Sequence, residues 1–441
     1  MRANLSGWGR FPRLAGDLHR PRDAAAIRAL IGQGPVIARG NGRSYGDAAA
    51  QPKGTIDMRG MAHMLSFDAE TGVLEAETGV MLGDVIAAFL PRGWFPPVTP
   101  GTKFVTLGGM IAADVHGKNH RRDGSIGRHV DWVDVMGPDG TVRRASARDN
   151  SDLFARTVGG MGLTGVILRA ALRLMPVPSG WIRQETVAAS NLTEAMDIFE
   201  TATTRYSVAW FDCLGRGEAL GRSLVMLGDH AEPQDLRDVR RAAPYDVPVR
   251  RARRVPLDAP GFVLNRHTLR AFNRLYYAAG MKKRGHSVVD WDSYFYPLDA
   301  IRDWNRIYGR RGFAQYQVVL PLAASHAGLT ALLGAISDAG QGSFLAVLKR
   351  LGAQDSPLSF PMEGYTLALD FPVSEAALRL LDQLDAITLA HGGRHYLAKD
   401  SRLSPETFHR ADPRAAVFAR ARAEEGCGGA FASAQSERLK I

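Results

Sequence analysis

The sequence has few of the features that mark a specialised class of protein. It contains only two cysteines, Cys213 and Cys427, which form neither a C-x-x-C pair nor a framework of disulfide bonds. No stretch approaches the roughly 18 uncharged apolar residues that a transmembrane helix requires, and the first ten residues lack the apolar run of a signal peptide. No cysteine and histidine spacing is typical of zinc. These absences predict a cytoplasmic protein without a metal ion.

The composition is otherwise that of an ordinary globular protein, apart from its charge. The 441 residues suit two or three domains, and the net charge is +10. Residues 237–284, here called the basic segment, contain thirteen arginines and lysines but only three acidic residues. A phosphorylated substrate, an anionic membrane surface or nucleic acid could explain this charge, and so could a solvated basic face. No nucleic-acid-binding module is recognisable nearby, so we expect no nucleic-acid partner.

Hydrophobic spacing divides the chain into two regions, each with both strands and helices. Pro176-Val-Pro178 favours an extended connection and marks the clearest boundary. The pattern predicts helices at 21–34, 82–90, 151–158, 324–338 and 373–391. It predicts strands at 34–39, 55–58, 73–78, 130–136, 142–144, 166–174, 206–212, 222–227, 314–320, 343–348 and 365–371. We therefore expect an α+β fold.

Two glycine-rich loops suggest a bound phosphate or nucleotide. Gly160-Met-Gly-Leu-Thr-Gly165 has the letters of a G-x-G-x-x-G fingerprint, but a helix is predicted before it and a strand after it. This order is the reverse of a Rossmann site and argues against nicotinamide binding there. The loop from Arg39 to Gly46 follows a strand, and its successive backbone N–H groups could cradle a pyrophosphate as a nest.

A third segment combines glycines with titratable side chains. Between residues 107 and 120 the chain carries the pair Gly108-Gly109 and then His116-Gly-Lys-Asn-His120. Glycines let backbone amides approach a planar or phosphorylated ligand closely, because no Cβ intervenes. Histidine and lysine next to them are placed to act on that ligand. The segment indicates a cofactor site, although a loop after a buried strand would also fit.

Five motifs occur in a characteristic order: Arg39-Gly-Asn-Gly-Arg-Ser-Tyr-Gly46, Pro100-Gly-Thr102, Leu107-Gly-Gly109, His116-Gly117 and Gly159-Gly-Met-Gly-Leu-Thr-Gly165. In this order they resemble the FAD-binding domain of the vanillyl-alcohol-oxidase-type flavoproteins. Further motifs are Gly7-Trp-Gly-Arg10, His116-Gly-Lys-Asn-His120, Ala209-Trp-Phe-Asp212, Gln315-Tyr-Gln317, Asp370-Phe-Pro372 and Ala398-Lys-Asp-Ser-Arg402. These resemble one branch of that family, which oxidises the 2′-hydroxyl of a polyprenylphosphoryl-ribose and so starts its epimerisation to the arabinose lipid of cell-wall arabinan.

The resemblance implies a two-domain fold of the PCMH type. The FAD-binding domain would comprise residues 1–178 and a returning segment, 394–441, and an α+β substrate domain on an antiparallel sheet would comprise 179–393. The implied cofactor-binding residues are Arg39, Gly40, Asn41, Gly42, Arg43, Ser44, Tyr45, Pro100, Gly101, Thr102, Gly108, Gly109, His116, Gly117, Gly162, Gly165 and Ile167. Those implied to bind substrate are Lys118, Gln315, Gln317, Lys349 and Tyr396.

Two residues are candidates for the catalytic base. Lys399 could hydrogen-bond the reacting hydroxyl, or accept its proton if burial lowers the lysine pKa, and His116 is the competing base. The sequence does not rank them. Relatives with covalently bound flavin carry a histidine in the first glycine loop, commonly just before the serine. Arg43 occupies that position here, and so we expect FAD to be bound non-covalently.

The basic segment bears on substrate and location. Its aromatic and aliphatic residues alternate with Arg266, Arg270 and Arg274, as in a helix at a membrane interface or a flap over a polyprenyl chain. Packing against the substrate domain explains the pattern equally well. We expect a peripheral protein at the inner membrane face that passes its ketone to an NAD(P)H-dependent short-chain reductase. A flavoprotein acting on a soluble polyol or aldonolactone, and a cofactor-free binding protein, are the alternatives.

Overall fold

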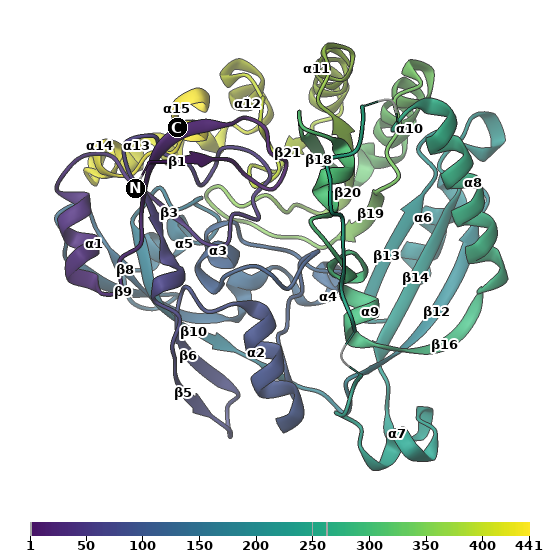
Figure 1. The fold of residues 1–441 in the computed structure, drawn as a ribbon, viewed down its shortest axis with the longest axis horizontal. Helices are drawn as coiled ribbons and strands as arrows, with labels where there is room; N and C mark the ends of the chain where they lie inside the picture. The colour runs from purple at the N-terminus through teal and green to yellow at the C-terminus, as the bar shows by residue number, and fades with distance from the viewer. Residues whose placement is uncertain (1, 249, 262) are drawn as a thin grey trace.

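Two sheet-based parts lie side by side in the computed structural model, which describes residues 2–248, 250–261 and 263–441 (Figure 1). Val249 and Phe262 of the basic segment lie outside these ranges. The first part contains a four-stranded sheet, ordered β1-β2-β4-β3, and a five-stranded antiparallel sheet, ordered β5-β6-β10-β8-β9. The strands of the four-stranded sheet are β1 (Arg2–Leu5), β2 (Leu14–His19), β3 (Ile37–Arg39) and β4 (Thr55–Asp57). Those of the five-stranded sheet are β5 (Met64–Asp68), β6 (Val73–Glu77), β8 (Val130–Met136), β9 (Val142–Ser146) and β10 (Val166–Arg173).

Short helices connect these strands and carry the glycine motifs. They are α1 (Ala24–Ile31), α2 (Leu82–Phe89), α3 (Leu107–Ala112), α4 (His120–Asp123) and α5 (Ser151–Thr157). The pair Gly108-Gly109 lies inside α3, capped by Thr106, rather than in the loop before a helix. The G-x-G-x-x-G loop runs from α5 into β10, which confirms that its context is not that of a Rossmann site.

The second part is built on one antiparallel sheet of eight strands, ordered β16-β12-β14-β13-β19-β20-β18-β21. All its neighbouring strands pair in the antiparallel sense. This confirms the expected α+β fold with an antiparallel second sheet. The strands are β12 (Trp181–Ala189), β13 (Tyr206–Phe211), β14 (Ser223–His230), β16 (Gly285–Asp290), β18 (Phe313–Pro321), β19 (Ala346–Leu351), β20 (Gly364–Pro372) and β21 (Arg394–His395).

Helices α6 (Leu192–Thr201), α10 (Leu322–Ala339) and α11 (Glu375–Ala390) cover one face of this sheet. In α10, Leu329, Leu332, Leu333 and Ile336 recur at helical spacing and are buried in a core with side chains of the central strands. The sequence pattern predicted both α10 and α11 but missed β12 and β16, because polar residues interrupt these strands at several positions. The opposite face of the sheet is turned toward the first part.

The last residues of the chain pack against the first part. Phe431 is fully buried with Ile27, Val36 and Ile56, and Phe418 and Leu439 join the core of the five-stranded sheet. Figure 1 shows these C-terminal helices beside the N-terminal strands. They are α12 (Pro405–Ala411), α13 (Arg414–Glu424), α14 (Cys427–Ala430) and α15 (Ala434–Leu439). Residues 394 and 395 still pair with β18 in the second sheet, so the return to the first part begins after β21.

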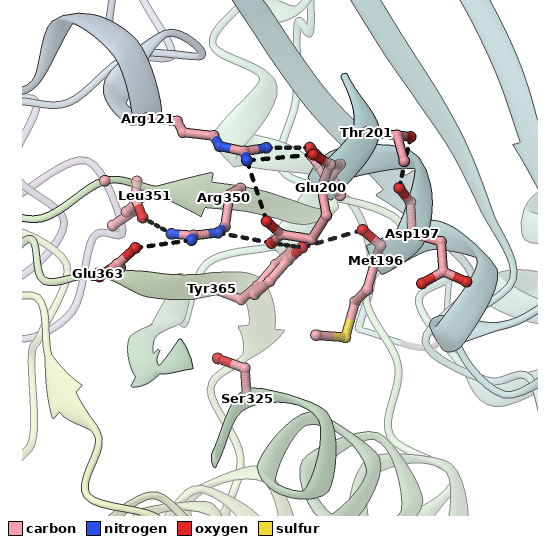
Figure 2. A network of polar contacts seen from close by, with 12 residues as sticks. Arg121, Met196, Asp197, Glu200, Thr201, Ser325, Arg350, Leu351, Glu363 and Tyr365 are labelled. Atoms are coloured by element: carbon pink, nitrogen blue, oxygen red, sulfur yellow. Dashed lines mark hydrogen bonds and ion pairs between the residues drawn. The ribbon is translucent and has the colours of Figure 1, made fainter. Parts of the chain in front are cut away.

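The two parts are joined by a chain of ion pairs that runs from α4 through α6 to β19 (Figure 2). Arg121 contacts the Glu200 carboxylate at 3.2 Å, and the opposite oxygen of Glu200 accepts hydrogen bonds from Arg350 at 2.8 Å and Tyr365 at 2.7 Å. Arg350 also contacts Glu363 at 3.1 Å, and its side chain is only 5% exposed. Glu200 therefore links a helix of the first part to two strands of the second.

Removing Glu200 should destabilise the protein more than removing Glu363. Glu200→Ala deprives the buried Arg350 guanidinium and the Tyr365 hydroxyl of a partner, and we expect the free energy of unfolding to fall by about 1–3 kcal/mol. Glu363 is 52% exposed and has one charged contact, so Glu363→Ala should cost less than about 1 kcal/mol. Urea unfolding of both variants measures the difference; equal losses would show that Glu200 does not hold the two parts together.

Candidate active site

A cavity of about 1260 Å³ lies between the first part and the face of the eight-stranded sheet that is turned toward it. It exceeds the roughly 300–1,000 Å³ of a typical site for one small ligand, so it has room for a large cofactor together with a substrate. One end is lined by the glycine motifs of the first part. The other end is lined by strands β13, β18, β19 and β20 and by α8 (Arg266–Lys282).

Strand alternation selects the side chains at the second end. Successive residues of a strand point to opposite faces, so every second residue of β18, β19 and β20 enters the cavity while its neighbours pack under the helices. The register then sets the neighbours within the cavity: Gln315 lies opposite Asp370, Gln317 opposite Ala368, and Lys349 opposite Thr366. Polar groups are thus grouped on a sheet face that is otherwise apolar.

The loop between β3 and β4 forms the wall at the glycine end. Its backbone is fixed from both sides, because Trp8 donates to the Ser44 carbonyl at 2.7 Å and Tyr45 donates to the Ala398 carbonyl at 2.9 Å. Gly42 has a φ of 63°, in the left-handed region that favours glycine. The Arg43 guanidinium lies 4.0 Å from the Trp8 ring centroid, which orients this cation at the cavity.

The remaining glycines allow close packing around the same space. A Cβ on Gly40 would lie 2.0 Å from the Thr106 hydroxyl, and one on Gly108 would lie 2.8 Å from the Thr78 Cβ. Gly162 and Gly165 have φ values of 79° and 150° and also line the cavity. At Gly101 the position of a Cβ is open space. Backbone atoms of these glycine-containing segments therefore line the cavity at its glycine end.

These features fit the FAD that the resemblance implies. The cavity offers backbone at the glycine end, and three buried polar atoms on its lining have no partner within the described protein: Thr99 Oγ1, His116 Nδ1 and Gln315 Oε1. Buried polar groups are costly unless they are hydrogen-bonded, so such atoms indicate a bound group. Within the described ranges, no cluster of three or more histidine, cysteine or carboxylate side chains could hold a metal ion.

Lys399 lies at the junction of the two ends. Its Nζ is 3.6 Å from the Tyr45 ring centroid, and the negative charge of the Asp370 carboxylate acts on it. Burial lowers the pKa of Lys399, an effect that the charge of Asp370 opposes, and burial raises the pKa of Asp370. Gln315 donates to Asp370 at 2.6 Å, and the Tyr308 hydroxyl donates to it at 3.3 Å. Proton exchange near neutral pH is therefore available here.

His116 is neutral and has one ring nitrogen engaged. Burial, followed by the charge of Lys349, lowers its pKa well below the usual value. The Gln317 amide nitrogen lies 3.1 Å from His116 Nε2 and also donates to Thr366 at 3.2 Å. With Nε2 accepting from this amide, the proton of the neutral ring is on Nδ1, the unpartnered atom. His116 thus presents a hydrogen-bond donor to the cavity.

Two further lysines form a second cationic group in the cavity. Burial lowers the pKa of Lys118 to about 7 and that of Lys349 to about 8. Lys118 Nζ donates to the Tyr294 carbonyl and lies 4.2 Å from the Tyr294 ring centroid. Neither lysine forms an ion pair with a carboxylate of the described residues. A bound anion would supply the missing negative charge, raise the pKa of both lysines and so favour their cationic form.

The structure brings most of the predicted site residues together, with two exceptions. Arg39 points away from the cavity and donates to the Ser6 and Ala49 carbonyls, so it supports the loop from behind. Gly117 packs against Thr99 and Asn119 instead of the cavity. The Tyr396 hydroxyl donates to Ala113, so only its ring faces the site. The other predicted residues line the cavity: Gly40, Asn41, Gly42, Arg43, Ser44, Tyr45, Pro100, Gly101, Thr102, Gly108, Gly109, His116, Lys118, Gly162, Gly165, Ile167, Gln315, Gln317, Lys349 and Lys399.

Sequence reasoning assigned no role to several other lining residues. Asp370 stood in a recognised motif, Asp370-Phe-Pro372, and that motif was the one signal that could have marked it as a candidate. Trp210 and Phe344 line the apolar end, where Trp210 packs against Tyr276 of α8 at 4.6 Å between ring centroids. Nothing in the sequence pattern connects these distant positions, because strand order brings them together.

Comparison with known proteins supports the cofactor and the family. A model of the FAD binding domain matches residues 20–146. Decaprenylphosphoryl-beta-D-ribose oxidase of Mycolicibacterium smegmatis is 36% identical over 99% of this chain and 97% of its own length. An uncharacterised protein of Streptomyces coelicolor is 35% identical over 80% of this chain. Cytokinin dehydrogenase 7 of Oryza sativa is 29% identical over 43% of this chain and 37% of its own length.

The match to the Mycolicibacterium smegmatis oxidase extends over both parts of the chain, whereas the FAD-domain match lies within the first part. It therefore includes the strands of the second sheet that carry Gln315, Lys349 and Asp370, as well as the segment of Lys399. FAD is the cofactor, and the enzyme is an oxidoreductase that acts on CH–OH groups. This chain belongs to the decaprenylphosphoryl-β-D-ribose oxidase family of vanillyl-alcohol-oxidase-type flavoproteins.

Proposed function

We propose that this protein oxidises the 2′-hydroxyl of a polyprenylphosphoryl-ribose to a ketone, as the first half of epimerisation to the arabinose lipid. The observation that carries the proposal is a single cavity that joins an FAD-type glycine wall to a lysine-bearing sheet face and to α8. Bound FAD supplies the two-electron acceptor. The protein contributes binding, orientation and control of one proton.

Lys399 is the residue that takes the proton of the reacting hydroxyl at Nζ. It is partly buried, desolvation lowers its pKa, and Asp370 lies close enough to influence its charge. His116 is less suited to this role, because Gln317 already occupies its Nε2 and its free nitrogen carries a proton. His116 instead donates a hydrogen bond from Nδ1 to the bound cofactor or sugar. This assignment separates the roles that the sequence left open.

Lys118 and Lys349 suit the phosphate of such a substrate. Both are partly buried cavity lysines without a carboxylate partner among the described residues, and a phosphodiester brings a permanent negative charge. A soluble polyol or an aldonolactone brings no such charge. The lysines thus favour the lipid-linked substrate over these alternatives.

Helix α8 suits the lipid portion. Phe272 and Tyr276 line the apolar end of the cavity yet are each 42% exposed, and the neighbouring Leu275 is 72% exposed. Arg266 and Arg274 are exposed on the same helix. An apolar stripe bordered by arginines is typical of a helix at a membrane interface. No helix in the described ranges is long and apolar enough to cross a membrane, so the proposed association is peripheral.

A second enzyme would complete the epimerisation. The ketone must be reduced from the opposite face of the sugar, and the only G-x-G-x-x-G loop of this sequence lies between a helix and a strand in the wrong order for nicotinamide. We propose an NAD(P)H-dependent short-chain reductase as the partner that receives the ketone. We propose that both enzymes work at the inner membrane face.

The FAD should be released when the protein is denatured. Arg43 occupies the loop position of the histidine that links flavin in covalent relatives, and Cys213 and Cys427 are buried away from the cavity. We expect a yellow protein whose flavin absorbance moves to the supernatant after acid precipitation. Flavin fluorescence that stays with the polypeptide in a denaturing gel would contradict non-covalent binding, and a colourless protein that FAD cannot reconstitute would contradict the flavoenzyme assignment.

Lys399→Ala should abolish most turnover while leaving FAD bound. Loss of a positioned acid–base group typically lowers the rate by about 10²- to 10⁴-fold. His116→Gln retains a hydrogen-bond donor and should lower kcat less. Stopped-flow reduction of the flavin by a synthetic polyprenylphosphoryl-ribose measures the step directly. Near-native flavin reduction in Lys399→Ala, together with a severe loss of flavin reduction in His116→Gln, would show that the two roles are reversed.

Neutralising the arginines of α8 should release the protein from anionic membranes. Each basic residue near an anionic surface contributes about 1 kcal/mol, so the triple variant R266Q/R270Q/R274Q should partition about 10²-fold less well into phosphatidylserine-containing vesicles. R92Q/R122Q/R148Q removes the same charge from exposed positions on the first part and is the matched control. Flotation of both variants tests the surface; equal binding would leave α8 without a membrane role.

A further inference from the structure

The strained backbone at Asp114 lies two residues before His116. Asp114 has a φ of 39°, outside the usual region for a residue with a Cβ, and its side chain is buried. Such a conformation is energetically unfavourable and persists only where the surroundings fix it. Asp114 follows α3 and reverses the chain, so that the next residues enter the cavity wall.

Four neutral donors fix the Asp114 carboxylate. Oδ1 accepts from the Gly127 backbone N–H at 2.9 Å. Oδ2 accepts from the Ser125 hydroxyl at 2.7 Å, from the Gln354 amide at 2.7 Å and from the Ser359 hydroxyl. No arginine or lysine of the described chain forms an ion pair with it. The carboxylate is therefore stabilised entirely by groups whose positions it also dictates.

These donors belong to the two segments that enclose His116. Ser125 is bridged to His116 through the backbone, and Gly127 follows it in the first part. Ser359 belongs to the loop between β19 and β20 and precedes Phe360, whose ring centroid is 5.4 Å from that of His116. Phe360 also stacks on Tyr396 at 4.6 Å. One buried carboxylate thus ties together both walls around the His116 ring.

His120 determines which groups donate and which accept in the hydrogen bonds that lead to Asp114. Its Nδ1 accepts from the Gly352 backbone N–H at 3.1 Å, so its proton must be on Nε2, which donates to the Gln354 oxygen at 3.0 Å. The Gln354 amide nitrogen is then turned toward Asp114. Burial lowers the pKa of His120 to about 4, so the ring is neutral at neutral pH. The direction of the hydrogen bonds from His120 through Gln354 to Asp114 is therefore fixed.

We infer that Asp114 is a positioning residue for His116, acting through Ser125 on one side and through Gln354 and Ser359 on the other. The inference rests on the proposed role of His116 as a donor within the cavity, but it does not depend on the identity of the substrate. His120 and Gln354 keep the donors directed at Asp114, and Asp114 holds the loop of Phe360 against the His116 ring. Loss of the carboxylate should leave FAD bound and misplace the His116 Nδ1–H.

Asp114→Asn is the direct test, because the amide has the same shape but offers an NH₂ group to donors. Ser359→Ala is the milder second variant, since it removes one donor and leaves the carboxylate. Asp212→Asn is the matched control: Asp212 is buried and bonded to Arg222 and Asn273 in the second part, away from the cavity lining. All are prepared as FAD-loaded, full-length protein.

The first readout is ¹⁵N NMR of the histidine rings, assigned with H116Q and H120Q, because it reports the tautomer without turnover. We expect His116 as Nδ1–H and His120 as Nε2–H in the native protein, with the His116 signals shifted in Asp114→Asn, shifted less in Ser359→Ala and unchanged in Asp212→Asn. Unchanged His116 signals in a folded Asp114→Asn protein, or a different native tautomer at His120, would overturn the inference.

The second readout is the split between kcat and KM with the polyprenylphosphoryl-ribose. Misplacement of a catalytic-site group by about 1 Å can cost about 10²-fold in rate, so kcat should fall by that order in Asp114→Asn with KM little changed. An equal fall in kcat in Asp212→Asn at a matched melting temperature would show a structural role only. If this lipid reduces the flavin in no variant, the native protein included, the substrate proposal fails while the NMR result stands by itself.

Discussion

The contact of residues 114–123 with the second sheet is the constraint on which the site depends. This short segment belongs to the first part, yet the Lys118 carbonyl accepts a hydrogen bond from the Ser207 backbone N–H, and Arg121 contacts Glu200. Cavity side chains come from both parts, so their separation is fixed only while this contact holds. A Cβ on Gly352 would lie 2.7 Å from the Arg121 carbonyl, which shows how closely the two parts approach.

Burial of charge explains the chemistry of the cavity better than any single motif. Three lysines, Lys118, Lys349 and Lys399, lie in one cavity, and burial lowers the pKa of each. Among the described residues, a carboxylate (Asp370) raises the pKa of Lys399 but not of the other two lysines. That difference supports the proposed roles, in which Lys399 exchanges a proton and the other two lysines bind an anion. Under this proposal, one residue type takes two roles according to its neighbours.

The apolar end of the cavity relates the enzyme to the lipid substrate that we propose. A soluble sugar needs no exposed aromatic helix, whereas a polyprenyl chain would have to leave the site along an apolar path. Phe272 and Tyr276 would provide that path, because they line the cavity and remain accessible from outside. Exposed apolar residues in one helix are costly in water and indicate a surface that is covered in use.

The sequence by itself determined the elements with regular hydrophobic spacing and the glycine positions, because both depend on local geometry. It therefore predicted α10, α11, β18, β20 and the backbone lining of the cofactor site. Tertiary structure alone decided that Arg39 supports its loop from behind, that Asp370 joins Lys399, and that Asp114 connects two segments around His116. The Asp114 role depends on contacts between residues more than 200 positions apart. The other two depend on strand order and on the packing of loops, and no local pattern encodes any of the three.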